Sequence, residues 1–422
     1  MIKDKATYKN YMDFVINRVN SLRNTKHTGD LNTKVKKVAV ILCGSRNGSS
    51  LLKTIMSKSQ DVAYLSGEEE PFYILSGNGF PYSSNSDVFG SPLNNKQELL
   101  DNIFDEMGVN TKDINIDQII HNWKNRIPLQ YPRITNNEHV NNIENIWKSF
   151  ESSTLSEAEY SYYELNQMFL KTFYRGKQEF GYYDIIQENT PFLLDDDVNR
   201  PKIEEPPFVI PELRRPITEQ DCEDKTFIFK TPQDCYRIGI FEELFPNAEI
   251  KYIHLSRGFA QSVNGLMDGW LSETGFFAHN MEIIDEKLNI KGYTEVVKGG
   301  DKWWNFDLPA NWREYKDKSL EEVCLNQWHQ AHSTILKSGV KTLRIKFEDF
   351  AIDPQGTIDT ITNYLGINKV VTEKLPLIMV TETPSDFRWH KRKNIIEALS
   401  KQNKTKDLML ELGYSMDPNT WI

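Results

Sequence analysis

The chain has 422 residues, of which 39% are hydrophobic, so it can bury the core of a globular protein with about one to three domains. Its 60 acidic and 50 basic residues give a net charge of −10, which argues against a surface built to hold duplex nucleic acid. No run reaches the roughly 18 apolar residues that a membrane helix needs, and the N-terminus lacks the apolar core of a secretory signal. We therefore expect a cytoplasmic protein that binds neither nucleic acid nor a membrane.

The N-terminal part of the chain predicts a helix and a linker. Apolar residues recur at helical spacing over residues 1–22, and residues 23–36 are mostly polar. The first strand signal follows at once. We therefore expect a helix and linker over residues 1–36, followed by a single domain over residues 37–422.

Strand and helix signals alternate over the rest of the chain. The predicted strands cover residues 38–43, 226–230, 249–255 and 341–347, with another one ending shortly before Glu68. The predicted helices cover residues 49–58, 96–107, 114–124, 140–149, 235–244, 320–337 and 357–365. This alternation predicts an α/β fold with a mostly parallel sheet flanked by helices, in which the carboxyl ends of the strands form the ligand edge.

Two segments interrupt this alternation. Residues 83–180 contain helical stretches separated by Asn-rich turns, and we expect them to form a large, mostly helical insertion over the sheet. Residues 195–222 are rich in Pro, Glu and Asp and predict an irregular excursion.

The cysteines and histidines show no metal-binding pattern. The four cysteines are Cys43, Cys222, Cys235 and Cys324. They form no C-x-x-C pair and lie in or beside apolar runs, which is typical of buried free thiols in a reducing compartment. His329 and His332 share a helical stretch without a third ligand, so a solvated or hydrogen-bonded pair is favoured over a zinc site. We assign no metal.

A glycine loop connects the first predicted strand to its helix. In Gly44–Ser50, successive backbone N–H groups and the positive end of the helix dipole form an anion cradle, for which phosphate is the natural occupant. The nucleoside-triphosphate signature requires Lys after the second glycine, whereas Ser49 follows Gly48 here. Arg46 supplies the positive charge instead. Taken alone, the motif is equally compatible with a glycine turn that caps a helix.

A second anion site is expected where the strand over residues 249–255 ends. Arg257 follows this strand, and Ser262 and Asn264 lie in the first turns of the next helix. A guanidinium can bind phosphate through two hydrogen bonds, and hydroxyl and amide groups one turn further on can complete the site. An arginine in a surface salt bridge is the alternative.

Together these motifs resemble those of the sulfotransferase family, whose members use 3′-phosphoadenosine 5′-phosphosulfate (PAPS) and have a P-loop-like α/β fold. Residues 46–52 resemble the family's sulfate-donor loop, R-S-G-[ST]-[ST]-L-[LM], with Asn47 at the variable position. Residues 229–232 resemble the family's K-[TD]-P element, residues 244–248 its F-P-[ND]-A element and residues 253–257 its strand-Arg element. Residues 347–350 resemble its [YF]-E-D-L element, residues 353–354 its D-P element, residues 364–366 its F-L-G element and residues 387–392 its closing basic element.

The resemblance implies that the chain binds PAPS and releases adenosine 3′,5′-bisphosphate (PAP) without a metal. The residues that it implies for the donor are Arg46, Asn47, Gly48, Ser49, Ser50, Arg257, Ser262, Asn264, Phe347, Lys391 and Arg392. Gly265 stands where the family usually has a serine for the 3′-phosphate, so that contact must come from Ser262 or be replaced by Asn264. Phe347 is expected to pack on the adenine.

Three adjacent carboxylates, Glu68–Glu70, follow the second predicted strand and point to a general base. Such a run is usually solvated charge, but a carboxylate held among like charges has a raised pKa, which suits a base near neutrality. The chain resembles the bacterial and tyrosylprotein branch, whose base is a Glu at this point. The match favours Glu69 as the base, with Glu68 as the alternate. Arg46 and Lys230 are expected to stabilise charge on the leaving 5′-phosphate.

An acidic segment that contains tryptophans follows the second anion site and is the candidate acceptor site. Its candidate residues are Asp268, Trp270, Glu273, His279, Asp301 and Trp304. They could pack as core aromatics with solvated acids, or they could bind a small cationic acceptor through charge and cation–π attraction. We expect the second arrangement and a small-molecule acceptor, such as a bacterial natural product of the saxitoxin type, that takes the sulfuryl group on oxygen or nitrogen.

Two other functions are considered. A P-loop kinase is disfavoured because no Lys follows Gly48 and no clear Walker-B acid ends a later strand. A non-catalytic PAP-binding module would keep the nucleotide residues but would need no carboxylate near Arg46.

Overall fold

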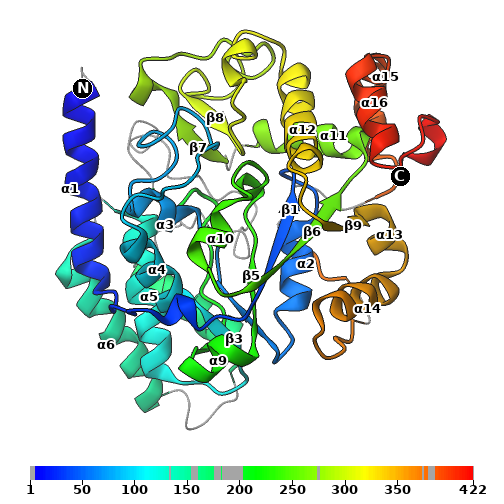
Figure 1. Ribbon diagram of the computed structural model, residues 1–422. Coiled ribbons are helices and arrows are strands. Elements are labelled where there is room, and N and C mark those ends of the chain that lie inside the picture. The colour runs from blue at the N-terminus through cyan, green and yellow to red at the C-terminus, as the bar shows by residue number, and fades with distance from the viewer. Residues whose placement is uncertain are drawn as a thin grey trace.

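The computed structural model describes residues 5–132, 135–153, 160–174, 182, 203–272, 276–372, 375–378 and 385–421. At its centre lies a seven-stranded sheet in the order β4-β3-β2-β5-β1-β6-β9 (Figure 1). The strands are β1 (Lys37–Cys43), β2 (Val62–Tyr64), β3 (Gly108–Asn110), β4 (Arg214–Pro216), β5 (Thr226–Phe229), β6 (Glu249–Ser256) and β9 (Thr342–Lys346). β3 runs antiparallel to both of its neighbours, and the other strand pairs are parallel. The predicted α/β fold with a mostly parallel sheet is confirmed.

Helices flank the sheet, and a second, two-stranded sheet lies apart from it (Figure 1). The helices are α1 (Lys5–Arg23), α2 (Ser49–Met56), α3 (Glu70–Leu75), α4 (Lys96–Glu106), α5 (Ile116–Gln130), α6 (Asn137–Ser153), α7 (Tyr162–Phe173), α9 (Glu219–Asp224), α10 (Ile240–Leu244), α11 (Phe259–Trp270), α12 (Leu320–Lys337), α13 (Phe347–Ile352), α14 (Pro354–Leu365), α15 (Lys393–Ser400) and α16 (Asn403–Glu411). The second sheet consists of β7 (Phe277–Asn280) and β8 (Trp303–Asn305).

The central strand β1 is buried on both faces, as its continuous apolar run predicts. Its even-numbered residues from 38 to 42 pack into one core with side chains of α1, α4, α10 and α12. Its odd-numbered residues from 39 to 43 pack into another core with α2 and α14. Successive side chains of a strand point to opposite faces, so one short apolar run supports both layers of helices.

Both segments predicted as insertions also extend the sheet. Residues 83–180 contain α4 to α7 but also β3, and the described part of residues 195–222 contains β4 and α9, so the expectation of an irregular excursion is wrong there. Each of the two strands has only three residues, too few to show alternation. Gly108 permits their close approach, because a Cβ on it would lie 2.8 Å from the backbone oxygen of Arg215.

The predicted helix over residues 235–244 is divided. A 3₁₀ helix covers Pro232–Tyr236, and α10 begins only at Ile240. Between them, the buried guanidinium of Arg237 forms ion pairs with Glu70 and Asp87. The break therefore serves a buried charge network that the local sequence pattern does not reveal.

The four cysteines are all free and buried, as predicted. Burial raises the pKa of the Cys43 thiol to about 12, so this thiol is a poor nucleophile at neutral pH. Within the ranges given above, no helix combines the length and apolar character needed to cross a membrane. The proposed division into residues 1–36 and 37–422 stays a prediction.

Candidate active site

The loop between β1 and α2 has the shape of an anion cradle. Arg46 and Gly48 both adopt left-handed backbone conformations, with φ of 64° and 88°. Gly48 also lies directly against Phe347, because a Cβ on Gly48 would be 2.3 Å from the ring. Glycine meets both requirements without strain. The loop backbone is therefore held close to Phe347 at the N-terminus of α2, where an anion is favoured.

Arg257, which follows β6, is a partly buried cation beside this loop. Its guanidinium carbon lies 4.6 Å from the centre of the Phe347 ring, and Nη1 donates to the backbone oxygen of Arg46 at 3.3 Å. Its Nε is buried and has no hydrogen-bond partner among the described residues. Burial lowers the pKa of Arg257 to about 10, with Glu348 opposing this shift and Arg46 adding to it. A partly buried cation with an unused Nε donor is well suited to bind an anion.

The other residues predicted around the 3′-phosphate already have partners. Ser262 Oγ donates to the side-chain oxygen of Asn47, Oδ1, at 3.1 Å. Asn264 accepts a hydrogen bond from Arg392. Lys391 and Arg392 form ion pairs with Asp268. Of the predicted 3′-phosphate residues, Arg257 is thus the one whose buried donor has no partner in the described part of the chain.

Arg388 belongs to the same basic cluster, although its side chain was not among the predicted site residues. Its Nη2 donates to Asp268 Oδ2 at 2.9 Å, and its charge contributes to the lowered pKa of Arg257. It lies within residues 387–392, the segment that resembles the family's closing basic element. The motif did not indicate which of its side chains would approach Arg257.

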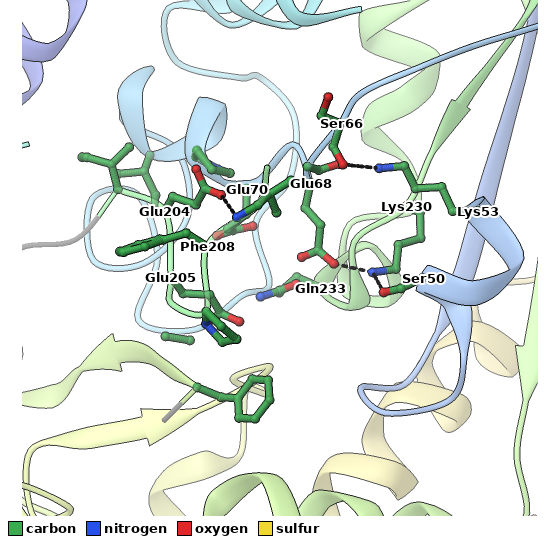
Figure 2. A pocket seen from close by; sticks show the side chains of 18 of the residues that line it. Ser50, Lys53, Ser66, Glu68, Glu70, Glu204, Glu205, Phe208, Lys230 and Gln233 are labelled. Carbon is green, nitrogen blue, oxygen red and sulfur yellow. Dashed lines mark hydrogen bonds and ion pairs between the residues drawn. The ribbon is translucent and has the colours of Figure 1, made fainter. Parts of the chain in front are cut away.

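Lys230 and Glu68 form an ion pair beside the loop. Lys230, at the end of β5, donates to Ser50 Oγ at 3.0 Å and to Glu68 Oε1 (Figure 2). Thr231 Oγ1 donates to the other oxygen of Glu68 at 3.0 Å. Burial opposes the charge of Lys230, but Glu68 and its neighbours raise the pKa of Lys230, which remains a cation. The Glu68 side chain is 32% exposed, so this carboxylate can be reached from outside the core.

Glu69, the residue that the family match favours as the base, points into the protein interior. It is 1% exposed, and its carboxyl group lies within hydrogen-bonding reach of the carboxyl group of Asp234. It is the N-terminal cap residue of α3, and this turn directs its side chain inward while Glu68 stays outside. Burial raises the pKa of Glu69, and burial and the proximity of Glu69 raise that of Asp234 well above its usual range. The two carboxyl groups thus form a coupled pair that favours sharing a proton.

This pair predicts a pH-dependent stability. A buried carboxyl whose pKa is raised keeps its proton in the folded state above the pH at which the unfolded chain loses it, so folding stability falls as pH rises above about 4.5. Glu69→Gln removes one of the two carboxyl groups that cause this fall in folding stability, so it is expected to raise the melting temperature at pH 8 by at least about 2 °C. The exposed Glu411 gives a control, and Glu411→Gln should change nothing. A lower melting temperature for Glu69→Gln at pH 8 would contradict the raised pKa.

A cavity of about 300 Å³ lies beside Glu68 and Lys230 (Figure 2). Five glutamates face it, namely Glu68, Glu70, Glu204, Glu205 and Glu212. Its apolar wall consists of Pro71, Ile74, Phe80, Ile203, Pro207, Phe208, Val209, Ile210, Phe276, Ala278 and Ile378. Lys53 is its other ammonium group. The cavity therefore combines an acidic polar part with a large apolar wall.

His279 is the one predicted acceptor residue that lines this cavity within the described part of the chain. Its Nε2 lies 2.8 Å from Asp87 Oδ1, and Asp87 raises the pKa of His279 although burial alone would lower it. Trp270 and Trp304 are core side chains instead, in edge-to-face contact with ring centres 5.4 Å apart. Their indole N–H groups are satisfied inside the protein.

The acidic residues of the predicted acceptor segment do not line the cavity among the described residues. Asp268 is enclosed by the cations of Arg388, Lys391 and Arg392. Asp301 is not among the residues that line the cavity, and Glu273 lies outside the described residues. The acidic side chains that line the cavity come from two other segments, residues 68–70 and 204–212.

Among the described residues, no group of three or more His, Cys, Asp or Glu side chains is placed to hold a metal ion.

Comparison with known proteins gives a distant structural likeness. No family model and no curated protein matches the chain. A solved structure described as the sulfotransferase domain from the curacin biosynthetic pathway aligns with 90% of this chain and 99% of its own, at 12% sequence identity and a TM-score of 0.37. So low a TM-score supports no inference about activity.

Proposed function

We propose that the protein is a sulfotransferase that moves a sulfuryl group from PAPS to a hydroxyl or nitrogen of a small-molecule acceptor. The observation that supports this proposal is that the glycine loop and the cation of Arg257 both contact one aromatic ring, that of Phe347. The Gly48 loop lies against Phe347, and the unused donor of Arg257 lies over the same ring. A nucleotide with phosphates at its 5′ and 3′ positions needs two such separate sites.

The residues of the chain fit this donor. The loop N–H groups and Arg46 would hold the 5′ phosphosulfate, and Arg257 Nε would donate to the 3′-phosphate. Phe347 contacts both Gly48 and Arg257 and would contact the adenine or ribose. PAPS supplies the sulfuryl group in an activated mixed anhydride.

The groups beside the donor site provide charge stabilisation and proton transfer. The ammonium of Lys230 and the N–H groups of the loop are placed to stabilise negative charge on the leaving 5′-phosphate. Glu68 contacts Lys230 and also faces the cavity, so it can take the proton of the attacking acceptor atom. We therefore assign the base to Glu68, the alternate in the family match, in place of Glu69.

A P-loop kinase remains the less favoured enzyme. Its loop would need a lysine directly after Gly48, where this chain has Ser49. Lys53, further along α2, instead donates to the backbone oxygens of Ser66 and Gly67 at 3.1 and 2.7 Å. A non-catalytic PAP-binding module would not need Glu68 exposed beside Lys230. The accessible carboxylate at this position favours an enzyme.

The cavity favours a cationic acceptor with an apolar body. The five glutamates outnumber the two lysines that line it, although Arg126 and Arg237 behind the wall neutralise Glu204 and Glu70. Aromatic rings in the wall add cation–π attraction. Cationic natural products, including guanidinium alkaloids of the saxitoxin type, combine these features.

A set of three phenols of similar shape tests this acceptor charge. Tyramine is a cation, 4-ethylphenol is neutral, and 3-(4-hydroxyphenyl)propionate is an anion. We expect kcat/KM for sulfation to fall in that order, by about tenfold per step, because about 1.4 kcal/mol of charge attraction gives a factor of ten. Product mass measures each rate, and a preference for the anion would contradict the cationic assignment.

The glycine at the usual serine position gives a gain-of-function test. A Cβ on Gly265 would lie 3.7 Å from the Cβ of Arg46, so a side chain fits there without a clash. Gly265→Ser should restore a hydroxyl near the 3′-phosphate and strengthen PAP binding by about tenfold. Gly265→Ala fills the same space without a hydroxyl and should show no gain. Calorimetric titration distinguishes them, and equal affinities would place the 3′-phosphate elsewhere.

The activity itself is tested by incubating the protein with PAPS and candidate acceptors. Mass spectrometry should detect an acceptor that has become heavier by one sulfuryl group. If PAP binds but no acceptor of any charge is sulfated, the PAP-binding module becomes the better function.

A further inference from the structure

Behind the donor loop, two buried histidines form a hydrogen-bonded chain with Asn47. Asn47 Nδ2 lies 2.8 Å from His332 Nε2, and His332 Nδ1 lies 2.9 Å from His254 Nε2. On its other side, Asn47 Oδ1 accepts a hydrogen bond from Ser262 Oγ at 3.1 Å. All four side chains are at most 1% exposed. The chain of contacts joins the loop to β6, α11 and α12, and the proposed chemistry does not use the histidines.

The donors and acceptors in this row of hydrogen bonds determine which ring nitrogen of His332 carries the hydrogen. An amide nitrogen only donates, so His332 Nε2 must accept from Asn47. In a neutral ring the hydrogen then lies on Nδ1 and is donated to His254 Nε2. Burial lowers the pKa of His254 to about 4 and that of His332 well below its usual value, so both rings are neutral at physiological pH.

The loop needs such support because its backbone is strained. Arg46 is a non-glycine residue at φ 64°, a conformation that persists only where the surroundings hold it. Asn47 follows Arg46 directly, and its side chain is hydrogen-bonded to His332. The packing is close as well, since a Cβ on Gly44 would lie 3.3 Å from Asn47 Nδ2 and 3.7 Å from His332 Nε2.

We propose that His332, oriented by His254, is a positioning residue that holds Asn47 and thereby keeps the donor loop in its ligand-binding shape. The hydroxyl hydrogen of Ser262 is part of the same arrangement, since it is donated to Asn47. Ser262 would then serve the loop, leaving the 3′-phosphate to Arg257. The proposal rests on the proposed function only in taking PAP as the ligand of the loop.

Titration with PAP tests the positioning role. His332→Phe removes the acceptor for Asn47 and should weaken PAP binding by about tenfold, with kcat falling less than KM rises. His329 lies on the same helix but is only partly buried, so His329→Phe serves as the matched control and should bind PAP as the wild type does. Wild-type affinity in His332→Phe would overturn the proposal. If that variant does not fold, Gly44→Ala tests the same contact by pressing on the Asn47 amide, and unchanged PAP affinity there would equally overturn it.

The hydrogen positions give a second readout that a purely structural role would not move. In protein labelled with ¹⁵N-histidine and free of nucleotide, His332 should show a neutral ring with hydrogen on Nδ1 from pH 5 to pH 8. Hydrogen on Nε2, or a titration of His332 in this range, would overturn the proposal. Failure of the wild type to bind PAP would instead refute the proposed donor, and the ¹⁵N result would still decide the histidine arrangement.

Discussion

Replacing Glu68 by Gln is expected to lower kcat by a factor of about 10² to 10⁴, the usual contribution of a general base. The amide keeps the size of the side chain but cannot take a proton from the acceptor. Because Glu68 lies beside Lys230 and the cavity and not on the Phe347 and Arg257 side of the loop, PAP affinity should stay within a few-fold of wild type. Turnover is measured as sulfated product by mass, and affinity by calorimetry.

Glu69→Gln is the matched control, because it makes the same chemical change one residue away. Glu69 is buried against Asp234 and does not line the cavity, so this variant should retain most of its turnover. Full activity in Glu68→Gln, or loss of activity in Glu69→Gln alone, would return the base to Glu69.

Replacing Arg257 by Ala is expected to weaken PAP binding by about 10²-fold or more, since it removes a partly buried cation that has an unused Nε donor and that we propose to hold the 3′-phosphate. Adenosine 5′-monophosphate differs from PAP only in lacking the 3′-phosphate, and its affinity should change little. The wild type should therefore prefer PAP strongly, and the variant should bind both nucleotides alike. Calorimetric titration of both ligands measures this difference.

Arg344 offers a control of the same residue type on the neighbouring strand β9, where it is exposed and donates to a backbone oxygen. Arg344→Ala should leave the preference for PAP intact. A preference for PAP that survives in Arg257→Ala would show that another cation, with Arg388 the first candidate, holds the 3′-phosphate.

Much of the fold could be predicted because the central strands are short, apolar and buried on both faces. The run over residues 38–43 supports two cores, so its pattern is continuous and easy to recognise. β3 and β4 were not predicted, because each has only three residues and is defined by its pairing with the other strand. Gly108 allows the backbone of Arg215 to approach closely. Pairing between distant segments leaves no local periodicity.

The relative positions of the loop residues and Arg257 could be predicted from the sequence, whereas the surroundings of the acidic residues could not; the roles of these residues in binding donor and acceptor stay predictions. Arg46, Gly48 and Arg257 lie at fixed offsets from strand ends, so the topology brings them together. In Glu68–Glu70 the three residues are identical, and only the start of α3 decides which carboxylate turns outward. The three cations that pair with Asp268 come from a segment about 120 residues later in the chain, so the local sequence around Asp268 could not indicate them.

The central claim is that the site is built for a nucleotide with a 3′-phosphate and not for a triphosphate with magnesium. Thermal unfolding with each ligand tests it most directly, because a ligand at 100 times its Kd stabilises the folded state by about 2.7 kcal/mol. We predict that PAP raises the melting temperature clearly and that ATP with Mg²⁺, at the same concentration, raises it far less. Equal shifts from the two nucleotides, or no shift with PAP, would contradict the assignment.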